Sequence, residues 1–198
     1  MAELAPDTRI NLTKASILLV DASAHSLDVT AQILKGFGVS TVHRFSDLKD
    51  AVKFLAQRTA DLFIIDPSIS NGEGYECVRD LRHSGRANAS MPVILVCGHV
   101  RKADLALARD SGANFVVAKP LAPVVLLQRL LWVAKDTRPF VDCGSYIGPD
   151  RRFKFEGPPA GSEGRRAEDL KAPLGDATEP NLSQDEVNAM LKPQRVII

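Results

Sequence analysis

The sequence predicts an α/β fold, a doubly wound five-stranded parallel sheet, followed by a largely disordered C-terminal tail. Short apolar runs without polar alternation recur along the chain, which is typical of strands buried on both faces of a parallel sheet. Between them lie longer segments whose apolar residues recur at helical spacing. Strand and helix alternate five times, and right-handed crossovers then place helices on both faces of the sheet.

The composition excludes several classes of protein. Of 198 residues, 45% are hydrophobic and 25% are charged, which is typical of a globular protein with a sizeable core. A net charge of +1 gives no global attraction to nucleic acid or to anionic membranes. The three cysteines are widely spaced and odd in number, which favours a reduced cytoplasmic setting. We find neither a signal peptide nor an apolar run of membrane-spanning length.

Five apolar runs are the expected strands. They are residues 17–20, 39–45, 62–65, 92–96 and 115–118. The first and third runs end on carboxylates, Asp21 and Asp66, and the fifth is followed by Lys119. Because the carboxyl ends of parallel strands meet at one edge of a sheet, we expect these charged side chains to lie close together. Taken alone, Asp66 also fits a turn or a helix cap, since Pro67 and Ser68 follow it.

Five segments at helical spacing separate or follow these strands. They are residues 26–36, 48–55, 75–81, 103–111 and 124–133. Gly36 and Gly112 end two of them, as expected at helix C-termini. The third is entered through a loop that contains Gly72 and Gly74.

The composition divides the chain into five parts. Residues 1–15 form an N-terminal extension, and residues 16–135 form the α/β domain. Residues 136–166 are rich in arginine, glycine and proline, and such a segment does not bury enough apolar surface to fold alone. Residues 167–181 are a linker, and residues 182–198 are a short amphipathic helix with a tail.

Residues 16–135 resemble the receiver domain of bacterial response regulators, the flavodoxin-like fold of CheY. Besides the charged strand ends, the likeness rests on Gly74, Gly112-Ala113 and Lys119-Pro120. The resemblance implies a phosphoryl acceptor at Asp66, Mg²⁺ bound by two adjacent acidic residues, and a lysine that binds the phosphoryl oxygens.

The chain departs from this pattern where the chemistry is most demanding. Asp21 is followed by Ala22, and the loss of one carboxylate weakens a magnesium site. Cys97 replaces the expected hydroxyl residue and is a poor partner for a phosphoryl oxygen. We therefore expect Mg²⁺ to bind weakly or not at all, with Asp21 and Asp66 as its ligands if it binds. A structural Asp66–Lys119 ion pair is favoured over active phosphoryl transfer, and Cys97 is interpreted as a small buried residue rather than a redox centre.

The arginine-rich segment has the composition of a guanine nucleotide site. Arginines bind phosphates and the Hoogsteen edge of guanine, carboxylates accept from its N–H groups, and tyrosine stacks on a base. The predicted nucleotide-binding residues are Arg138, Asp142, Tyr146, Asp150, Arg151 and Arg152. A receiver followed by such a segment is similar to the Cle group of CheY-like cyclic-di-GMP effectors, which implies a disordered segment that orders around cyclic-di-GMP. The alternative is a solvated tail that keeps the protein soluble.

The C-terminal helix has good capping residues and one apolar face. Ser183 and Glu186 form a capping box. The predicted partner-binding residues are Leu182, Val187, Met190 and Leu191. This segment resembles the N-terminal peptide of the flagellar switch protein FliM, which docks on CheY, and it could act in cis or in trans. A generic amphipathic helix is the alternative.

We therefore predict a non-enzymatic, cyclic-di-GMP-responsive effector that binds a flagellar motor or surface-attachment partner. It is expected in the cytoplasm, with recruitment to the flagellar pole. The main alternative is a single-domain response regulator of a two-component or chemotaxis system, phosphorylated on Asp66 by a histidine kinase. A third interpretation is an adaptor in which the tail helix alone matters.

Overall fold

The computed structural model describes residues 11–98, 101–136, 138–151 and 185. These residues contain a five-stranded parallel sheet of order β2-β1-β3-β4-β5, which confirms the predicted fold class. The strands are β1 (Ser16–Val20), β2 (Thr41–Phe45), β3 (Leu62–Ile65), β4 (Val93–Cys97) and β5 (Phe115–Ala118). The order places β1, β3 and β4 in the interior of the sheet, where their residues are almost all buried.

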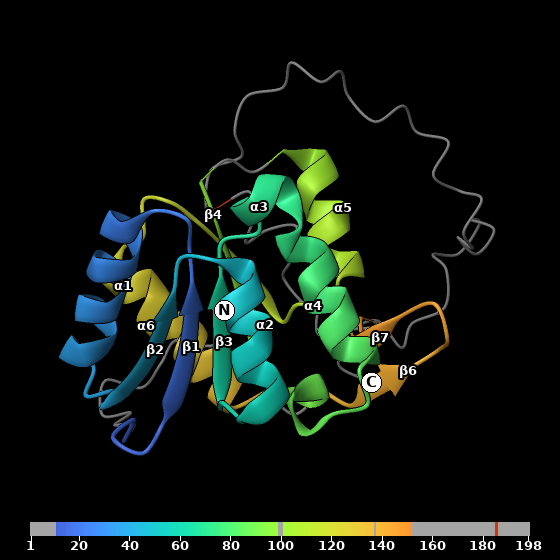
Figure 1. The fold of residues 1–198 in the computed structure, drawn as a ribbon, viewed down its shortest axis with the longest axis horizontal. Coiled ribbons are helices and arrows are strands. Elements are labelled where there is room, and N and C mark those ends of the chain that lie inside the picture. Colours follow the sequence, from blue (N-terminus) through green and yellow to red (C-terminus); the bar gives the residue numbers. More distant parts are fainter. Residues whose placement is uncertain (1–10, 99–100, 137, 152–184, 186–198) are drawn as a thin grey trace, which may run out of the picture.

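Helices cover both faces of this sheet (Figure 1). They are α1 (Ala24–Gly36), α2 (Leu48–Gln57), α3 (Ile69–Gly72), α4 (Gly74–His83), the 3₁₀ helix η1 (Ala87–Ser90), α5 (Lys102–Asp110) and α6 (Pro123–Ala134). Local chemistry explains where several of these helices begin. The side chain of Ser23 accepts from the N–H of Ser26 at α1, Asp47 caps α2, and Pro123 opens α6.

Two hydrophobic cores lie on opposite faces of the sheet. Successive residues of a strand point to opposite faces, so Leu18 and Val20 enter one core while Ile17 and Leu19 enter the other. The first core is closed by α2, α4 and α5, and the second by α1 and α6. The apolar residues on both faces of these strands are therefore buried, one set in each core.

Two predicted elements differ in detail from those observed. The loop containing Gly72 and Gly74 includes a short helix, α3, in which Ser70 and Asn71 have φ of 52° and 62°. Gly74 is required there because a Cβ atom would lie 2.6 Å from the Cα of Pro67. The second strand begins at Thr41 rather than at residue 39, although Val39 is still buried in the core.

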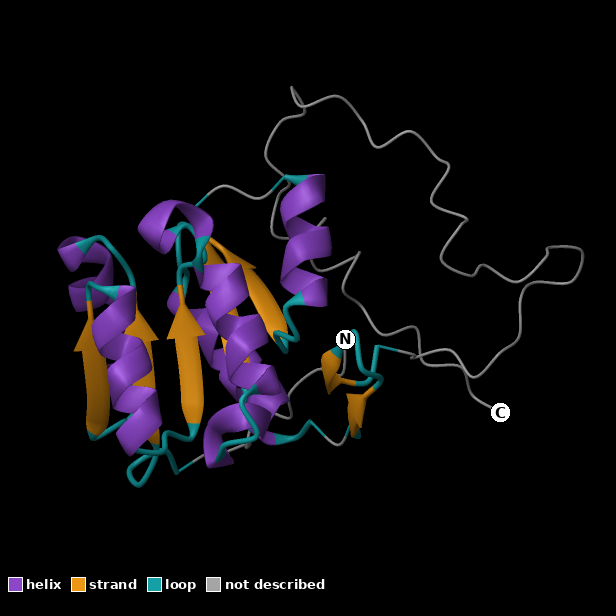
Figure 2. Cartoon of the chain, turned by 45° about the vertical axis from the view of Figure 1, so that its right-hand side comes forward, coloured by secondary structure: helices purple, strands orange, loops and turns teal. Residues whose placement is uncertain are grey.

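The start of the arginine-rich segment has a fixed structure, contrary to the expectation of disorder. Strands β6 (Phe140–Asp142) and β7 (Ile147–Pro149) form an antiparallel hairpin that contacts α4 (Figure 2). The hairpin folds because it packs on the domain instead of folding alone. Tyr146 is only 9% exposed, and a Cβ on Gly148 would lie 2.9 Å from the Cα of Gly112. Backbone meets backbone at this contact.

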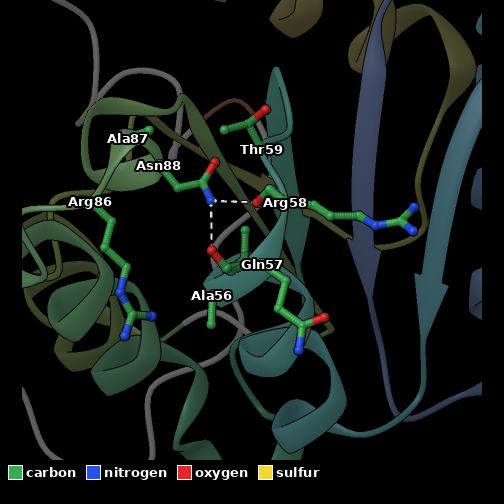
Figure 3. A pocket seen from close by; sticks show the side chains of 8 residues that line it. Ala56, Gln57, Arg58, Thr59, Arg86, Ala87 and Asn88 are labelled. Carbon is green, nitrogen blue, oxygen red and sulfur yellow. Dashed lines mark hydrogen bonds between the residues drawn. The ribbon is translucent and has the colours of Figure 1, made fainter.

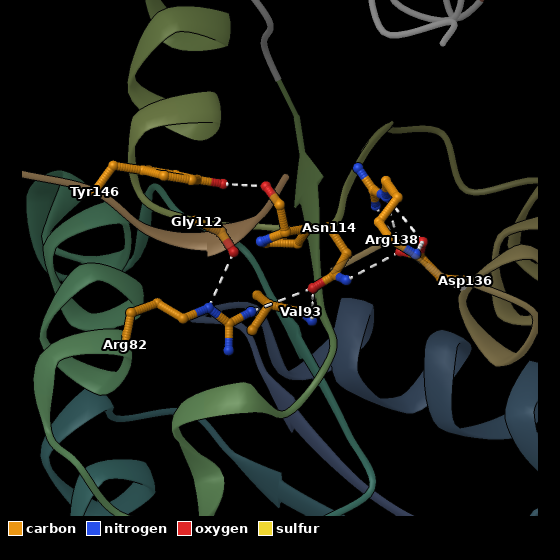
Figure 4. A network of polar contacts seen from close by, with 8 residues as sticks. Arg82, Val93, Gly112, Asn114, Asp136, Arg138 and Tyr146 are labelled. Carbon is orange, nitrogen blue, oxygen red and sulfur yellow. Dashed lines mark hydrogen bonds and ion pairs between the residues drawn. The ribbon is translucent and has the colours of Figure 1, made fainter. Parts of the chain in front are cut away.

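A buried arginine joins the hairpin to the rest of the domain (Figure 4). Arg82, at the end of α4, is 2% exposed. It donates to the carbonyls of Ala89, Met91 and Gly112 at 2.6–3.0 Å and to Asn114 Oδ1 at 3.2 Å. Its guanidinium also lies 5.2 Å from the ring centroid of Phe140 in β6. One side chain thus connects α4, the β4 and β5 entries and the hairpin.

Gly112→Ala is expected to loosen the hairpin. Gly112 has φ +83°, and an added Cβ would meet the carbonyl oxygen of Ile147 and lie 3.0 Å from Arg82 Cγ. Such overpacking costs about 1–3 kcal/mol, so amide hydrogen exchange in the hairpin should accelerate roughly tenfold to hundredfold. Gly38→Ala is the matched control, because Gly38 has φ +88° but nothing within 4 Å of an added Cβ. Equal exchange in the hairpin of both variants would contradict the packing described here.

Candidate functional site

Three charged residues meet at the carboxyl edge of the sheet, as predicted. Asp21 follows β1 and Asp66 follows β3, and the β1–β3 register sets Val20 opposite Ile65, so the two carboxylates are neighbours. Lys119 follows β5, on the far side of β4. Its stem passes near Gly98, where a Cβ would lie 3.9 Å from Lys119 Cδ.

The three side chains form one ion cluster. Lys119 Nζ lies 2.6 Å from Asp21 Oδ2 and 2.6 Å from Asp66 Oδ2. The remaining oxygens accept from the chain: Asp21 Oδ1 from the N–H of Ser23 at 2.8 Å, and Asp66 Oδ1 from the N–H of Ser68 at 2.8 Å. Asp21 and Asp66 are 6% and 7% exposed. The predicted Asp66–Lys119 ion pair is present, and it also includes Asp21.

The electrostatics favour the charged forms of Asp21 and Lys119. Burial raises the pKa of Asp21, but hydrogen bonds from Lys119, Ser26 and Ser23 outweigh it, and the net shift is downward. Burial lowers the pKa of Lys119, but hydrogen bonds to Asp21 and Asp66 outweigh it, and the net shift is upward. The lysine therefore supplies the positive charge that stabilises two buried carboxylates.

Cys97 and Tyr75 lie beside this cluster, and both have a raised pKa. Cys97 is buried at the end of β4, and burial raises the pKa of its thiol to about 12 despite a hydrogen bond with Tyr75. The thiol is therefore protonated at neutral pH, and a thiol without thiolate character is a poor nucleophile. Tyr75 belongs to α4, and burial likewise raises the pKa of its hydroxyl. The sequence analysis did not identify Tyr75 as a site residue.

Besides the contact of Arg82 with Phe140, two further arginine–aromatic contacts lie in the hairpin region. Arg151 pairs with Asp110 at 2.6 Å, and its guanidinium lies 3.3 Å from the ring centroid of Tyr146. Arg138 forms a fork with Asp136 at 2.6–3.0 Å and lies 4.4 Å from the ring centroid of Trp132. Tyr146 and Arg138 lie at opposite ends of the network drawn in Figure 4.

The structure brings together only some of the predicted nucleotide-binding residues. Tyr146 and Arg151 are in contact, and the Tyr146 hydroxyl donates to the Pro149 carbonyl at 2.8 Å. Asp142 accepts from the N–H of Gly144 at the hairpin turn, and the N–H of Asp150 donates to Pro139. The remaining predicted site residues lie outside the described part of the chain: Arg152, Leu182, Val187, Met190 and Leu191.

A hollow of about 540 Å³ lies at the opposite edge of the sheet, between the end of α2 and η1 (Figure 3). Asn88 lines it and is 3% exposed. Its amide donates to the carbonyls of Leu55 and Arg58 at 2.8 Å and accepts from the N–H of Ala60. Because these bonds hold the loop before β3, Asn88 has a structural role.

Residues 17–131 match the family described as the response regulator receiver domain, which is more than half of the chain. The chain belongs to the response regulator receiver family. This receiver domain is 32% identical over 117 residues to the transcriptional regulatory protein GltR of Pseudomonas aeruginosa, covering 58% of this chain and 47% of GltR. It is 30% identical over 118 residues to the sensor kinase/phosphatase CqsS of Vibrio cholerae, covering 59% of this chain and 17% of CqsS.

Solved structures of receivers share the fold. The chemotaxis response regulator CheY4 of Vibrio cholerae is 23% identical with a TM-score of 0.55, covering 60% of this chain and 98% of that chain. A CheY-like receiver from Methanospirillum hungatei is 24% identical with a TM-score of 0.54, covering 61% and 94%. The chain spans less than half the length of the two curated relatives, so the likeness concerns only a part of each.

The receiver family implies Mg²⁺ at the sheet edge, but the residues present do not fit it well. Mg²⁺ needs oxygen ligands in near-octahedral geometry. Ala22 offers no side-chain oxygen, and the Lys119 ammonium lies between the oxygens that Asp21 and Asp66 would supply. Within the described residues, no group of three or more His, Cys, Asp or Glu side chains could hold a metal.

Sequence reasoning missed the polar residues that position the hairpin, Arg82 and Asn114. Arg82 falls four residues after Val78, on the buried stripe of α4, and an arginine on an apolar stripe is a usable signal. Asn114 donates to Asp136 and accepts from the N–H of Val93, linking β4 to the residue that holds Arg138. Nothing in the residues near Asn114 announces that role.

Proposed function

We propose that this protein is a non-enzymatic, cyclic-di-GMP-responsive effector built on a receiver domain whose sheet-edge pocket has a structural role. The observation that carries the proposal is the contact of Arg151 with Tyr146, 3.3 Å from guanidinium carbon to ring centroid. Arg152 follows it directly in the sequence. Two arginines that are consecutive in the sequence, the first in contact with an aromatic ring, supply phosphate-binding groups and a ring on which a base can stack.

The chemistry of a guanine dinucleotide suits this side of the domain. Guanidinium groups bind phosphates in bidentate fashion and also pair with the O6 and N7 atoms of guanine. Arg138 lies over Trp132 in a second arginine–aromatic pair, and Asp142 lies at the exposed turn of the hairpin. A site for a bare polyanion would need the arginines but not the aspartates and aromatic rings.

The sheet-edge pocket supports the same proposal by its own chemistry. The Lys119 ammonium is bound to both carboxylates. Ala22 stands where the family has a second acidic residue, and Cys97, whose thiol has a raised pKa, ends β4. A phosphoryl group at Asp66 would have to displace Lys119 from Asp66 without a well-built metal site to neutralise its charge. The cluster therefore acts as a structural ion cluster.

The partner is proposed from the C-terminal segment, which lies outside the described residues. Its resemblance to the FliM peptide favours a flagellar motor or surface-attachment partner, in the cytoplasm and at the flagellar pole. Among the described residues, no helix has the length and apolarity needed to cross a membrane.

Two full-length variants test the proposal by titration with cyclic-di-GMP. Arg151→Ala combined with Arg152→Ala should weaken binding at least about tenfold, because charged hydrogen bonds contribute about 1.5–3 kcal/mol each. Asp66→Asn should leave the dissociation constant within about twofold of wild type, since Asp66 lies at the sheet edge and pairs with Lys119. The proposal is wrong if the arginine variant binds as wild type does.

Phosphorylation by a histidine kinase is a second candidate, favoured by one observation. Asp66 and Lys119 occupy the family positions of phosphoryl acceptor and phosphoryl-binding lysine, and they are in contact. Incubation with a small-molecule phosphodonor and Mg²⁺, followed by intact mass measurement, separates the candidates. A phosphoryl adduct that Asp66→Asn abolishes would establish the second.

A further inference from the structure

We propose that Asp110 is an intramolecular competitor of the nucleotide and sets the affinity of the cyclic-di-GMP site. Its carboxylate holds Arg151 over Tyr146, so the ligand must take Arg151 away from Asp110 before a base reaches the tyrosine ring. This inference rests on the proposed function and adds its regulation.

Asp110, Arg151 and Tyr146 are in direct contact, with Arg151 between the other two. Arg151 Nη1 lies 2.6 Å from Asp110 Oδ1, and the same guanidinium lies 3.3 Å from the Tyr146 ring centroid. Tyr146 is 9% exposed, and Gly148 lies close to its hydroxyl end, where an added Cβ would be 2.5 Å from the oxygen. Arg151 therefore covers ring surface that a base would need.

The Asp110–Arg151 pair is suited to open, whereas the Asp136–Arg138 pair is not. The side chains of Arg151 and Asp110 are 29% and 47% exposed, while those of Arg138 and Asp136 are 17% and 9% exposed. Asp136 also accepts from Asn114 and from the N–H of Arg138. A partly exposed ion pair with one short N–O contact contributes little free energy, so a competing anion can replace it.

Release of Arg151 does not leave Asp110 without a partner. Asp110 Oδ1 also lies 3.2 Å from Arg109 Nε, so its charge is still compensated when Arg151 moves to a phosphate. Phosphate and carboxylate oxygens seek the same fork of guanidinium N–H donors. Arg151 can therefore exchange the Asp110 carboxylate for a ligand phosphate without leaving either charge unpaired.

Whether Asp110→Asn tightens or weakens cyclic-di-GMP binding separates this competition from the opposite arrangement. If Asp110 competes, Asp110→Asn frees Arg151 and tightens binding. If a base instead stacks on the outer face of an Arg151 that Asp110 holds in place, Asp110→Asn removes that support and weakens binding.

The experiment is calorimetric titration of full-length wild type, Asp110→Asn and Asp28→Asn with cyclic-di-GMP. Asp28 forms an exposed 2.6 Å pair with Arg44, so Asp28→Asn removes the same charge and the same kind of contact elsewhere. We expect Asp110→Asn to lower the dissociation constant about two- to fivefold and Asp28→Asn to leave it unchanged. Binding by Asp110→Asn alone would support the inference further.

Three results would overturn the inference. Weaker binding by Asp110→Asn overturns it, and so does an effect equal to that of Asp28→Asn; in both, the proposed function stands. Absence of binding by wild type and Asp110→Asn alike overturns the proposed function together with the inference.

Discussion

Replacement of Lys119 by methionine is expected to lower the free energy of unfolding by about 3 kcal/mol at neutral pH. The substitution keeps the apolar stem but removes the ammonium that lies 2.6 Å from both Asp21 and Asp66. Two neighbouring buried carboxylates then lack their cation, and uncompensated buried charge is among the most destabilising changes in a protein. Urea denaturation of the full-length protein measures the effect.

The pH dependence of stability should change sign in this variant. In the wild type, the lowered pKa of Asp21 contributes stability that is present above its ordinary pKa of 3.8 and is lost as pH falls through the lower folded value. The raised pKa of Lys119 contributes stability that is fully present below 10.5 and is lost as pH rises through the higher folded value. In Lys119→Met, the hydrogen bonds from Ser26 and Ser23 to Asp21 remain, but burial and the neighbouring Asp66 carboxylate, which has lost the shared ammonium, both oppose ionisation of Asp21. Stability should therefore rise as pH falls from neutral toward 4.

Lys53→Met is the matched control for Lys119→Met. Lys53 forms a 2.9 Å pair with Asp50 on the exposed side of α2. This control should unfold at the wild-type urea concentration. Coincident unfolding curves for the two variants would show that the sheet-edge cluster does not stabilise the fold as argued.

Arg82→Met is expected to cost about 3–5 kcal/mol of unfolding free energy. The variant removes donors from the carbonyls of Ala89, Met91 and Gly112 and from Asn114, all around a side chain that is 2% exposed. Burial lowers the pKa of Arg82 to about 10, so the guanidinium is still charged at neutral pH and its bonds are charge-assisted. The hairpin should loosen as well, since Arg82 contacts Phe140.

Arg79→Met tests whether the position, rather than the loss of an arginine from α4, is responsible. Arg79 lies on the same helix, three residues earlier, and is exposed. Its replacement should change the unfolding free energy by less than about 0.5 kcal/mol. A comparable loss in both variants would contradict the anchoring role of Arg82.

The sequence was sufficient for the sheet and its charged edge because these features are local. Each strand is a contiguous apolar run, as in residues 62–65, and each ends where the pattern meets Asp66 or its counterparts. The rule that parallel strands share a carboxyl edge then brings Asp21, Asp66 and Lys119 together without any knowledge of long-range packing.

The hairpin could not be predicted in the same way, because its stability depends on contacts distant in sequence. Residues 140–149 include Phe140, Tyr146 and Ile147, but an isolated two-stranded hairpin is only marginally stable. The hairpin instead packs against Gly112 and Arg82, which lie elsewhere in the chain. The pairing of Arg151 with Asp110 likewise joins residues 41 positions apart. A composition rich in glycine and arginine therefore predicts disorder where packing produces a hairpin.

The central claim is tested most directly by isothermal titration of the full-length wild-type protein with cyclic-di-GMP, with GTP as the control ligand. The account predicts a dissociation constant of about 1 μM or lower for cyclic-di-GMP, corresponding to about −8 kcal/mol, and much weaker binding of GTP. Absence of binding, or equal binding of GTP, would contradict the effector function and return the question to Asp66 and a phosphodonor.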